Sequence, residues 1–152
     1  VGMRNNLFGF VPGTLPGQNI NYLLTTVGVD ALLKQHLDTA TQPAAFNYTA
    51  LTANSTAASA ASTTLTAEIA TASGGLIRKQ STFAHTNGTN TATLTTTFTA
   101  NGSDSLPVTV AKIGVFNASS SGTLAYESLL SSTATMTNVG DALTVTHTIT
   151  RS

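Results

Sequence analysis

The sequence predicts an all-β fold: an antiparallel β-sandwich, jelly-roll-like, with one short helix and an extended N-terminal arm. The first observation is a hairpin, in which residues 108–116 and 123–130 are apolar and β-branched and residues 117–122 between them are small and polar. The second is the alternation of residues 91–100 and 143–150, which gives each stretch one apolar face and one threonine face. Short strands at regular intervals with polar turns favour a sandwich over alternating strands and helices.

The strand over residues 108–116 is expected to be central. Val110 falls on one face of a regular strand, whereas Ile113 and Val115 fall on the other, with Lys112 between them. A strand with apolar residues on both faces is either covered on both sides or interrupted by a bulge, here near Lys112.

Further strands and turns follow from local composition. Residues 46–51 predict a short strand, and residues 76–85 predict a longer one. The Asn-Gly signal in residues 86–88 predicts a hairpin turn after the longer strand. Polar residues predict turns at 101–104 and 138–141.

The clearest helix is predicted over residues 29–37, after a stretch that is compatible with a strand over residues 21–27. Asp30 lies near the helix N-terminus, where the helix dipole favours a carboxylate, and Asp30 and Lys34 are spaced as an i, i+4 pair. The apolar stripe expected to face the core also carries His36 and consists of Val29, Leu32, Leu33 and Leu37.

Residues 52–75 are rich in Ala, Ser and Thr and contain few large side chains. We expect a loop followed by a short helix over residues 65–72, which Gly74 and Gly75 would end.

Two regions are expected: an arm over residues 1–21 and a sandwich domain over residues 22–152. The arm has proline-glycine turns and no sustained period, yet it is too apolar for a free tail. It either packs on its own domain or lies across a neighbouring subunit. The second alternative makes the following residues candidate intersubunit contacts: Leu7, Phe8, Phe10 and Val11.

Composition indicates a protein that works in an assembly. Charged residues make up 8% of the chain and the formal net charge is zero, so little self-repulsion keeps copies apart. The six Lys and Arg residues are scattered, which argues against a nucleic-acid partner. The chain has no Cys and no apolar run as long as a membrane span, and its first residues lack the order of a signal peptide, so no membrane partner is expected.

No catalytic, cofactor-binding or metal-binding residues are predicted, and we do not expect an enzyme. The sequence has no G-x-S-x-G elbow, no phosphate-binding loop and no cysteine nucleophile. The three histidines, His36, His85 and His147, are not spaced to share a face. His147 lies on the apolar face of the last strand, where a packed core histidine is expected rather than a metal ligand.

The order of several segments resembles a group of tailed-phage virion proteins. The matching segments lie at residues 25–28, 63–68, 112–117, 122–124 and 140–149, and the resemblance spans residues 22–150. Members of this group are capsid cement or decoration proteins and domains of tail or baseplate fibres, so the resemblance implies an accessory component of the virion without catalytic activity.

Our first hypothesis is therefore a non-enzymatic capsid cement protein, a homotrimer that binds the major capsid protein on the outer surface of the virion capsid. The alternative is a structural domain of a tail fibre or baseplate that takes part in host-surface binding. A bacterial adhesin or surface-layer module would need attachment or export signals, and the sequence shows none.

Overall fold

The computed structural model describes residues 14–15, 18–19, 23–38, 40 and 42–150. The described residues form antiparallel sheets and one helix, which confirms the predicted fold class. In chain order the elements are β1 (Thr14–Leu15), β2 (Gln18–Asn19), β3 (Leu23–Leu24), α1 (Thr26–Leu37), β4 (Tyr48–Thr52), β5 (Lys79–Gln80), β6 (Thr82–His85), β7 (Thr91–Thr99), β8 (Val108–Phe116), β9 (Leu124–Met136) and β10 (Ala142–Thr150).

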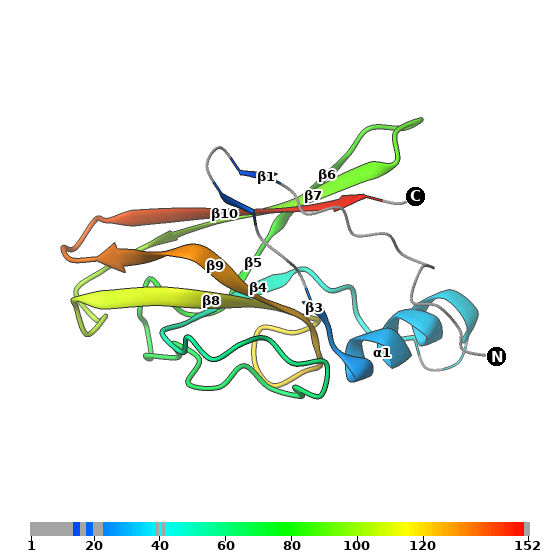
Figure 1. The fold of residues 1–152 in the computed structure, drawn as a ribbon, viewed down its shortest axis with the longest axis horizontal. Helices are drawn as coiled ribbons and strands as arrows, with labels where there is room; N and C mark the ends of the chain where they lie inside the picture. Colours follow the sequence, from blue (N-terminus) through cyan, green and yellow to red (C-terminus); the bar gives the residue numbers. More distant parts are fainter. Residues whose placement is uncertain (1–13, 16–17, 20–22, 39, 41, 151–152) are drawn as a thin grey trace.

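Two sheets form the body of the fold. One has five strands in the order β3-β9-β8-β4-β5, and the other has three in the order β10-β7-β6; β1 and β2 pair separately within the predicted arm. Figure 1 shows the two sheets stacked, with the connection between β4 and β5 running along the far side of the five-stranded sheet and α1 at one end. The five-stranded sheet therefore lies between two layers.

The predicted central strand is β8, which lies third of five and pairs with β9 as the expected hairpin. The register shifts between Val110 and Lys112, so the bulge near Lys112 is present. The bulge turns Val110 and Ile113 toward the same core, although regular alternation would separate them. The opposite face of β8 is buried as well, so the strand is both bulged and covered on both sides.

The main core fills the space between the two sheets. Phe98 from the three-stranded sheet and Ile113 from the five-stranded sheet are both buried there. The complete cluster of buried residues is Leu51, Leu76, Phe98, Ala100, Val110, Ile113, Met136 and Val145.

The prediction of a short helix over residues 65–72 is wrong. The backbone there bonds to the edge of β4 instead: the Ile69 N–H donates to the Leu51 carbonyl over 2.8 Å, and the Thr52 hydroxyl donates to the Thr66 carbonyl over 2.8 Å. Leu65 then packs on the outer face of the five-stranded sheet against Phe116. Tertiary partners for backbone and side chain outweigh a weak local helix preference.

The stretch over residues 76–85 is not one strand. Its first part, β5, pairs with β4 in the five-stranded sheet, and its second part, β6, pairs with β7 in the three-stranded sheet. The chain changes sheet at buried Ser81, whose side chain is hydrogen-bonded to Thr49 of one sheet over 2.9 Å and to Thr96 of the other over 2.7 Å.

The helix begins earlier than predicted and turns a partly different face inward. Thr25 caps it by accepting a hydrogen bond from the Gly28 N–H, and the buried helix residues are Gly28 and Ala31. The stripe expected to face the core does so only in part: Leu32 packs against a buried cluster, whereas Val29, Leu33 and Leu37 are exposed. A bulge in β9 at Ala125 lets the helix approach so closely that only small residues fit beneath it.

Two further local expectations need correction. Asp30 does not lie in the first turn of the longer helix, and no ion pair joins it to Lys34. The strand expected over residues 21–27 is confined to Leu23–Leu24 in the described residues, where β3 pairs with β9.

Candidate functional site

The histidines do not form a site. His36 on α1 and His85 on β6 are exposed, whereas His147 is buried on β10 beside Leu94 of β7. Burial lowers the pKa of His147 from 6.5 to about 4, so the ring is neutral at neutral pH. The prediction that His147 is a packed core residue is confirmed. Within the part of the chain that the structure describes, no group of three or more His, Asp or Glu side chains could hold a metal ion.

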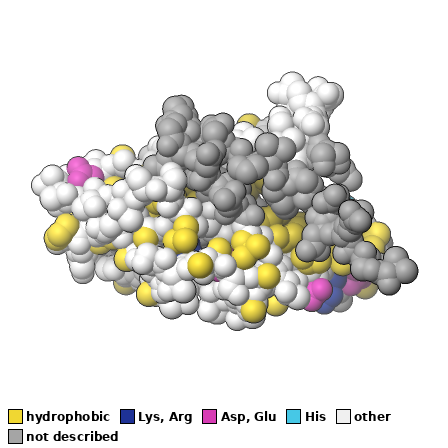
Figure 2. All heavy atoms as spheres, viewed as in Figure 1, with side chains coloured by type: hydrophobic (Ala, Val, Ile, Leu, Met, Phe, Trp, Pro, Cys, Tyr) yellow, Lys and Arg dark blue, Asp and Glu magenta, His cyan; other side chains and the backbone are white. Residues whose placement is uncertain are grey.

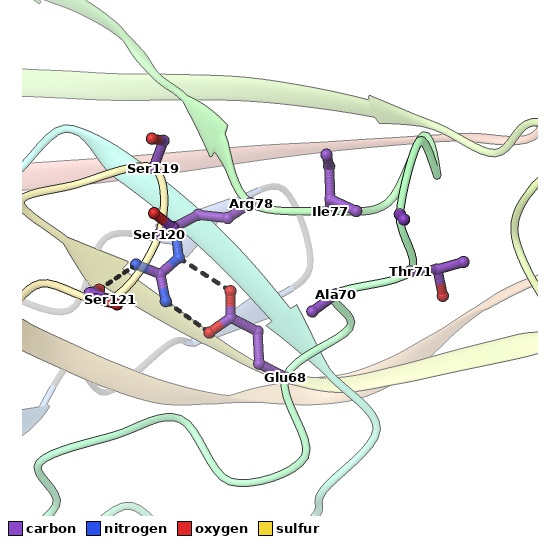
Figure 3. Close-up of a pocket in the computed structure, with 9 residues that line it drawn as sticks. Glu68, Ala70, Thr71, Ile77, Arg78, Ser119, Ser120 and Ser121 are labelled. Atoms are coloured by element: carbon purple, nitrogen blue, oxygen red, sulfur yellow. Dashed lines mark hydrogen bonds and ion pairs between the residues drawn. The ribbon is translucent and has the colours of Figure 1, made fainter.

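A cavity of about 310 Å³ lies beside Arg78 (Figure 3). Its floor is an ion pair: Arg78 Nη2 lies 2.6 Å from Glu68 Oε2, and Arg78 Nε donates to Glu68 Oε1 over 2.9 Å. Its rim includes the serines of the turn between β8 and β9. The lining residues are Glu68, Ala70, Thr71, Ala72, Ile77, Arg78, Ser119, Ser120 and Ser121.

Arg78 holds two segments of the fold together and does not present its guanidinium to a ligand. Its Nη1 donates to the carbonyls of Ala118 and Ser121 over 2.9 and 2.6 Å, and its guanidinium stacks 3.5 Å from the centre of the Phe116 ring. Glu68 neutralises the charge, while the turn and the ring occupy the remaining faces of the guanidinium. These contacts join the connection between β4 and β5, which is residues 53–78 and is called the covering loop from here on, to the end of the β8–β9 hairpin.

A second ion pair is buried under the covering loop. Lys112 Nζ lies 3.3 Å from Glu127 Oε2, and the two side chains are 5% and 2% exposed. Glu127 Oε1 also accepts hydrogen bonds from the Ser59 N–H over 2.6 Å and the Ser62 hydroxyl over 2.8 Å. The carboxylate therefore ties residues 59–62 of the loop to the sheet.

Sequence reasoning missed both ion pairs. In the sequence Arg78 and Lys112 are scattered cations, and Glu68 and Glu127 are acids far from them along the chain. The available signal was their position: each lies in a stretch otherwise almost free of charge, where an ionised side chain needs a partner to be buried.

The threonine face of the three-stranded sheet lies on the outside of the fold, as the alternation predicts. Cross-strand hydroxyl pairs run along it, with Thr97 Oγ1 lying 2.9 Å from Thr144 Oγ1 and Thr95 Oγ1 lying 3.4 Å from Thr146 Oγ1. We call the outward threonines of β7 and β10 the threonine face. It comprises Thr91, Thr93, Thr95, Thr97, Thr99, Thr144, Thr146, Thr148 and Thr150. This surface is neutral and hydroxyl-rich, so another protein can cover it without desolvating a charge.

The candidate intersubunit contacts Leu7, Phe8, Phe10 and Val11 lie outside the described residues, so their role stays a prediction. In the described residues no helix is long and apolar enough to cross a membrane.

A comparison with protein families decides the class of this protein. The model of the family described as podophage GP4 fiber I protein gp80 matches residues 20–150. The chain belongs to this gp80 family. It is therefore a phage virion structural protein, and the resemblance to phage virion proteins is confirmed at that level. No curated protein matches the sequence.

The gp80-family match covers both sheets and α1 but not residues 1–19 of the arm. Structural fibre proteins of phages are typically non-enzymatic, in line with a fold whose buried charges serve as structural ties.

Proposed function

We propose that this protein is a structural subunit of a virion fibre and that it acts through protein–protein contacts. The observation that carries the proposal is the match of residues 20–150 to a family described by a podophage fibre protein. Fibre subunits need surfaces that other virion proteins can cover, and the threonine face provides one with little desolvation cost.

The competing proposal is the capsid cement protein, a homotrimer bound to the major capsid protein on the outer capsid surface. The neutral threonine face would suit that role equally well. The fibre role is preferred because the matched family is described by a fibre and not by a capsid component.

Within the fibre proposal, a structural role is favoured over direct recognition of host sugars. Sugar-binding sites usually offer an aromatic ring on which the sugar stacks, and no aromatic residue lines the cavity beside Arg78. The polar groups at its floor already bind one another.

The test is to locate the protein on purified virions by immunogold electron microscopy and to measure its abundance relative to the major capsid protein. A fibre subunit should label fibres and be far less abundant than the capsid protein. Label spread over the capsid at an abundance close to that of the capsid protein would overturn the fibre proposal in favour of cement.

Variants should connect the location to the threonine face. Thr97→Lys combined with Thr144→Lys places two charges on this exposed face, and we expect folded protein that enters few particles. Thr56→Lys combined with Thr63→Lys, on exposed positions of the covering loop, adds the same two charges as a matched control and should assemble normally. Equal incorporation of both variants would exclude the threonine face as an assembly contact.

A further inference from the structure

The helix α1 presents a row of large apolar side chains to solvent, whereas its Leu32 packs on the core. Val29, Leu33 and Leu37 are 39%, 45% and 79% exposed, and their i, i+4, i+8 spacing places them in one row, here called the α1 stripe. Apart from this row, the exposed large hydrophobic residues among those described are Phe83 and Val139. The α1 stripe is thus the main row of exposed large apolar side chains in this part of the chain.

The outward position of the stripe is built into the docking of the helix. A Cβ added to Gly28 would lie 2.5 Å from the Ala125 carbonyl oxygen, and Ala31 is the other buried residue of the helix. Large side chains cannot replace these two residues against β9. The α1 stripe therefore stays on the outside as long as the helix is docked.

Two opposite charges line one edge of the stripe. Asp30 and Lys34 each follow a stripe residue by one position, and both are exposed. The ion pairs of the described residues are Arg78–Glu68 and Lys112–Glu127, so Asp30 and Lys34 do not pair with each other. Figure 2 shows acidic and basic side chains together with hydrophobic ones at the end of the molecule where α1 lies.

We propose that α1 is a self-association surface on which the α1 helix of a second copy packs antiparallel about a two-fold axis near Leu33. Leu33 then meets Leu33 of the second copy, and Val29 meets Leu37 of the second copy. A two-fold axis perpendicular to the helices brings the charged edges of both copies together, so Asp30 of each copy faces Lys34 of the other.

The charge pattern selects this arrangement over a parallel one. Parallel helices related by symmetry would place the Asp30 and Lys34 edge beside the opposite edge of the partner helix, which carries Leu32 and His36. The antiparallel arrangement alone gives two reciprocal pairs of opposite charge. The contact is small, so we expect weak association in dilute solution that strengthens where copies are held close together.

Self-association through α1 is testable on the purified chain of residues 1–152, whether or not the protein is a fibre subunit. Asp30→Lys gives a helix with two lysines at this edge, and Lys34→Asp gives one with two aspartates. Each variant alone should be monomeric by sedimentation velocity, whereas an equimolar mixture should associate at least about tenfold more tightly than either variant. If Asp30 and Lys34 acted only within their own helix, mixing the two variants could not restore association.

A control is needed to distinguish charge pairing between α1 helices from the general attraction between copies of opposite net charge. Thr56→Lys with Thr63→Lys, mixed with Thr56→Asp with Thr63→Asp, reproduces the net charges of the two α1 variants on exposed loop positions. This mixture should associate no more tightly than the wild type. Equal association of both mixtures, or no association of the α1 mixture, would overturn the proposal.

Because the chain has no cysteine, disulfide trapping can test the direction of the helices. Leu33→Cys should form linked dimers on mild oxidation, because packed helices bring Cα atoms at a contact within disulfide reach. Val29→Cys should link to Leu37→Cys in a mixture but not to itself. Val139→Cys, which is 66% exposed at another site, is the background control. Linking of Val29→Cys to itself, or of Leu33→Cys only at the background rate, would overturn the antiparallel arrangement.

Discussion

At the scale of single residues, this charge-poor protein uses several of its charges as structural ties. Arg78 and Glu68 hold the covering loop to the hairpin end, and Lys112 and Glu127 hold it to the sheet. Burial raises the pKa of Asp104, but hydrogen bonds from the N–H groups of Asn101, Gly75 and Leu76 lower it more, so the pKa lies below its ordinary value. These groups therefore stabilise connections between segments.

The buried imidazole of His147 makes stability depend on pH. Its pKa is about 4 in the folded state and 6.5 ordinarily, so the unfolded chain binds a proton between these values and the folded chain does not. The free energy of unfolding should be constant above about pH 6.5 with respect to this group and fall by about 3 kcal/mol as the pH drops to 4. Urea unfolding across this range measures the loss. His147→Gln should remove most of it, and an unchanged loss in that variant would exclude His147 as the cause.

The contributions of the buried residues Lys112 and Glu127 to the free energy of unfolding should depend strongly on each other. Glu127→Gln leaves the Lys112 ammonium buried without its counter-ion, so we expect the free energy of unfolding to fall by about 3 kcal/mol or more. In a double-mutant cycle with Lys112→Met, the double variant should lose less stability than the sum of the single variants. Thr135→Ala, in an exposed hydroxyl pair with Thr109, is a control with an expected change of about 0.5 kcal/mol or less. If the changes in the free energy of unfolding at Lys112 and Glu127 simply add in the double variant, the two side chains do not stabilise each other as an ion pair.

At the scale of elements, bulges in the β8–β9 hairpin determine what lies against it. The irregularity between Val110 and Lys112 turns Val110 and Ile113 toward one core. The extra residue Ala125 in β9 presents its carbonyl to the Thr25 N–H over 2.9 Å and so places the start of α1. A single hairpin therefore organises both the sheet core and the attachment of the helix.

Helix docking should depend on the missing side chain of Gly28. Gly28→Ala would place a Cβ 2.5 Å from backbone oxygen, and we expect overpacking to cost about 1–3 kcal/mol despite the higher helix propensity of alanine. Thermal unfolding and amide exchange of α1 measure the effect. Gly102→Ala meets no atom within 4 Å and should be neutral. If the Gly28→Ala variant is as stable as the wild type, the backbone of β9 at Ala125 can shift to accommodate the added methyl group without a loss of stability.

At the scale of the whole molecule, the fold is a sandwich with an additional covering layer. One sheet is enclosed by the other sheet and the connection between β4 and β5, while the second sheet turns its threonine face outward (Figure 1). Covering the inner sheet with an Ala-, Ser- and Thr-rich loop leaves a surface with few charges. Such a surface is suited to burial in a larger assembly, as membership of a family of phage virion proteins implies.

The predicted arm contacts can be tested in the chain of residues 1–152. Phe8→Ser combined with Phe10→Ser should leave the melting temperature unchanged but reduce incorporation into particles, because an intersubunit contact contributes only in the assembly. Incorporation is measured by quantitative immunoblotting of purified virions. A melting temperature that falls by several degrees would instead show that the arm packs on its own domain.

The sequence alone predicts the strands β7, β8 and β10, the first part of β9 and the turns between them, because two-residue alternation and turn chemistry are local properties. It does not predict that β9 continues from residue 131 to Met136. The change of sheet at Ser81 within residues 76–85 and the inward position of Gly28 on α1 follow from the three-dimensional fold and not from the sequence pattern. The ion pairs of Arg78 and Lys112 are also visible only in the folded structure. Each depends on partners that the fold brings together from separate segments, and no periodicity within one segment encodes that distance.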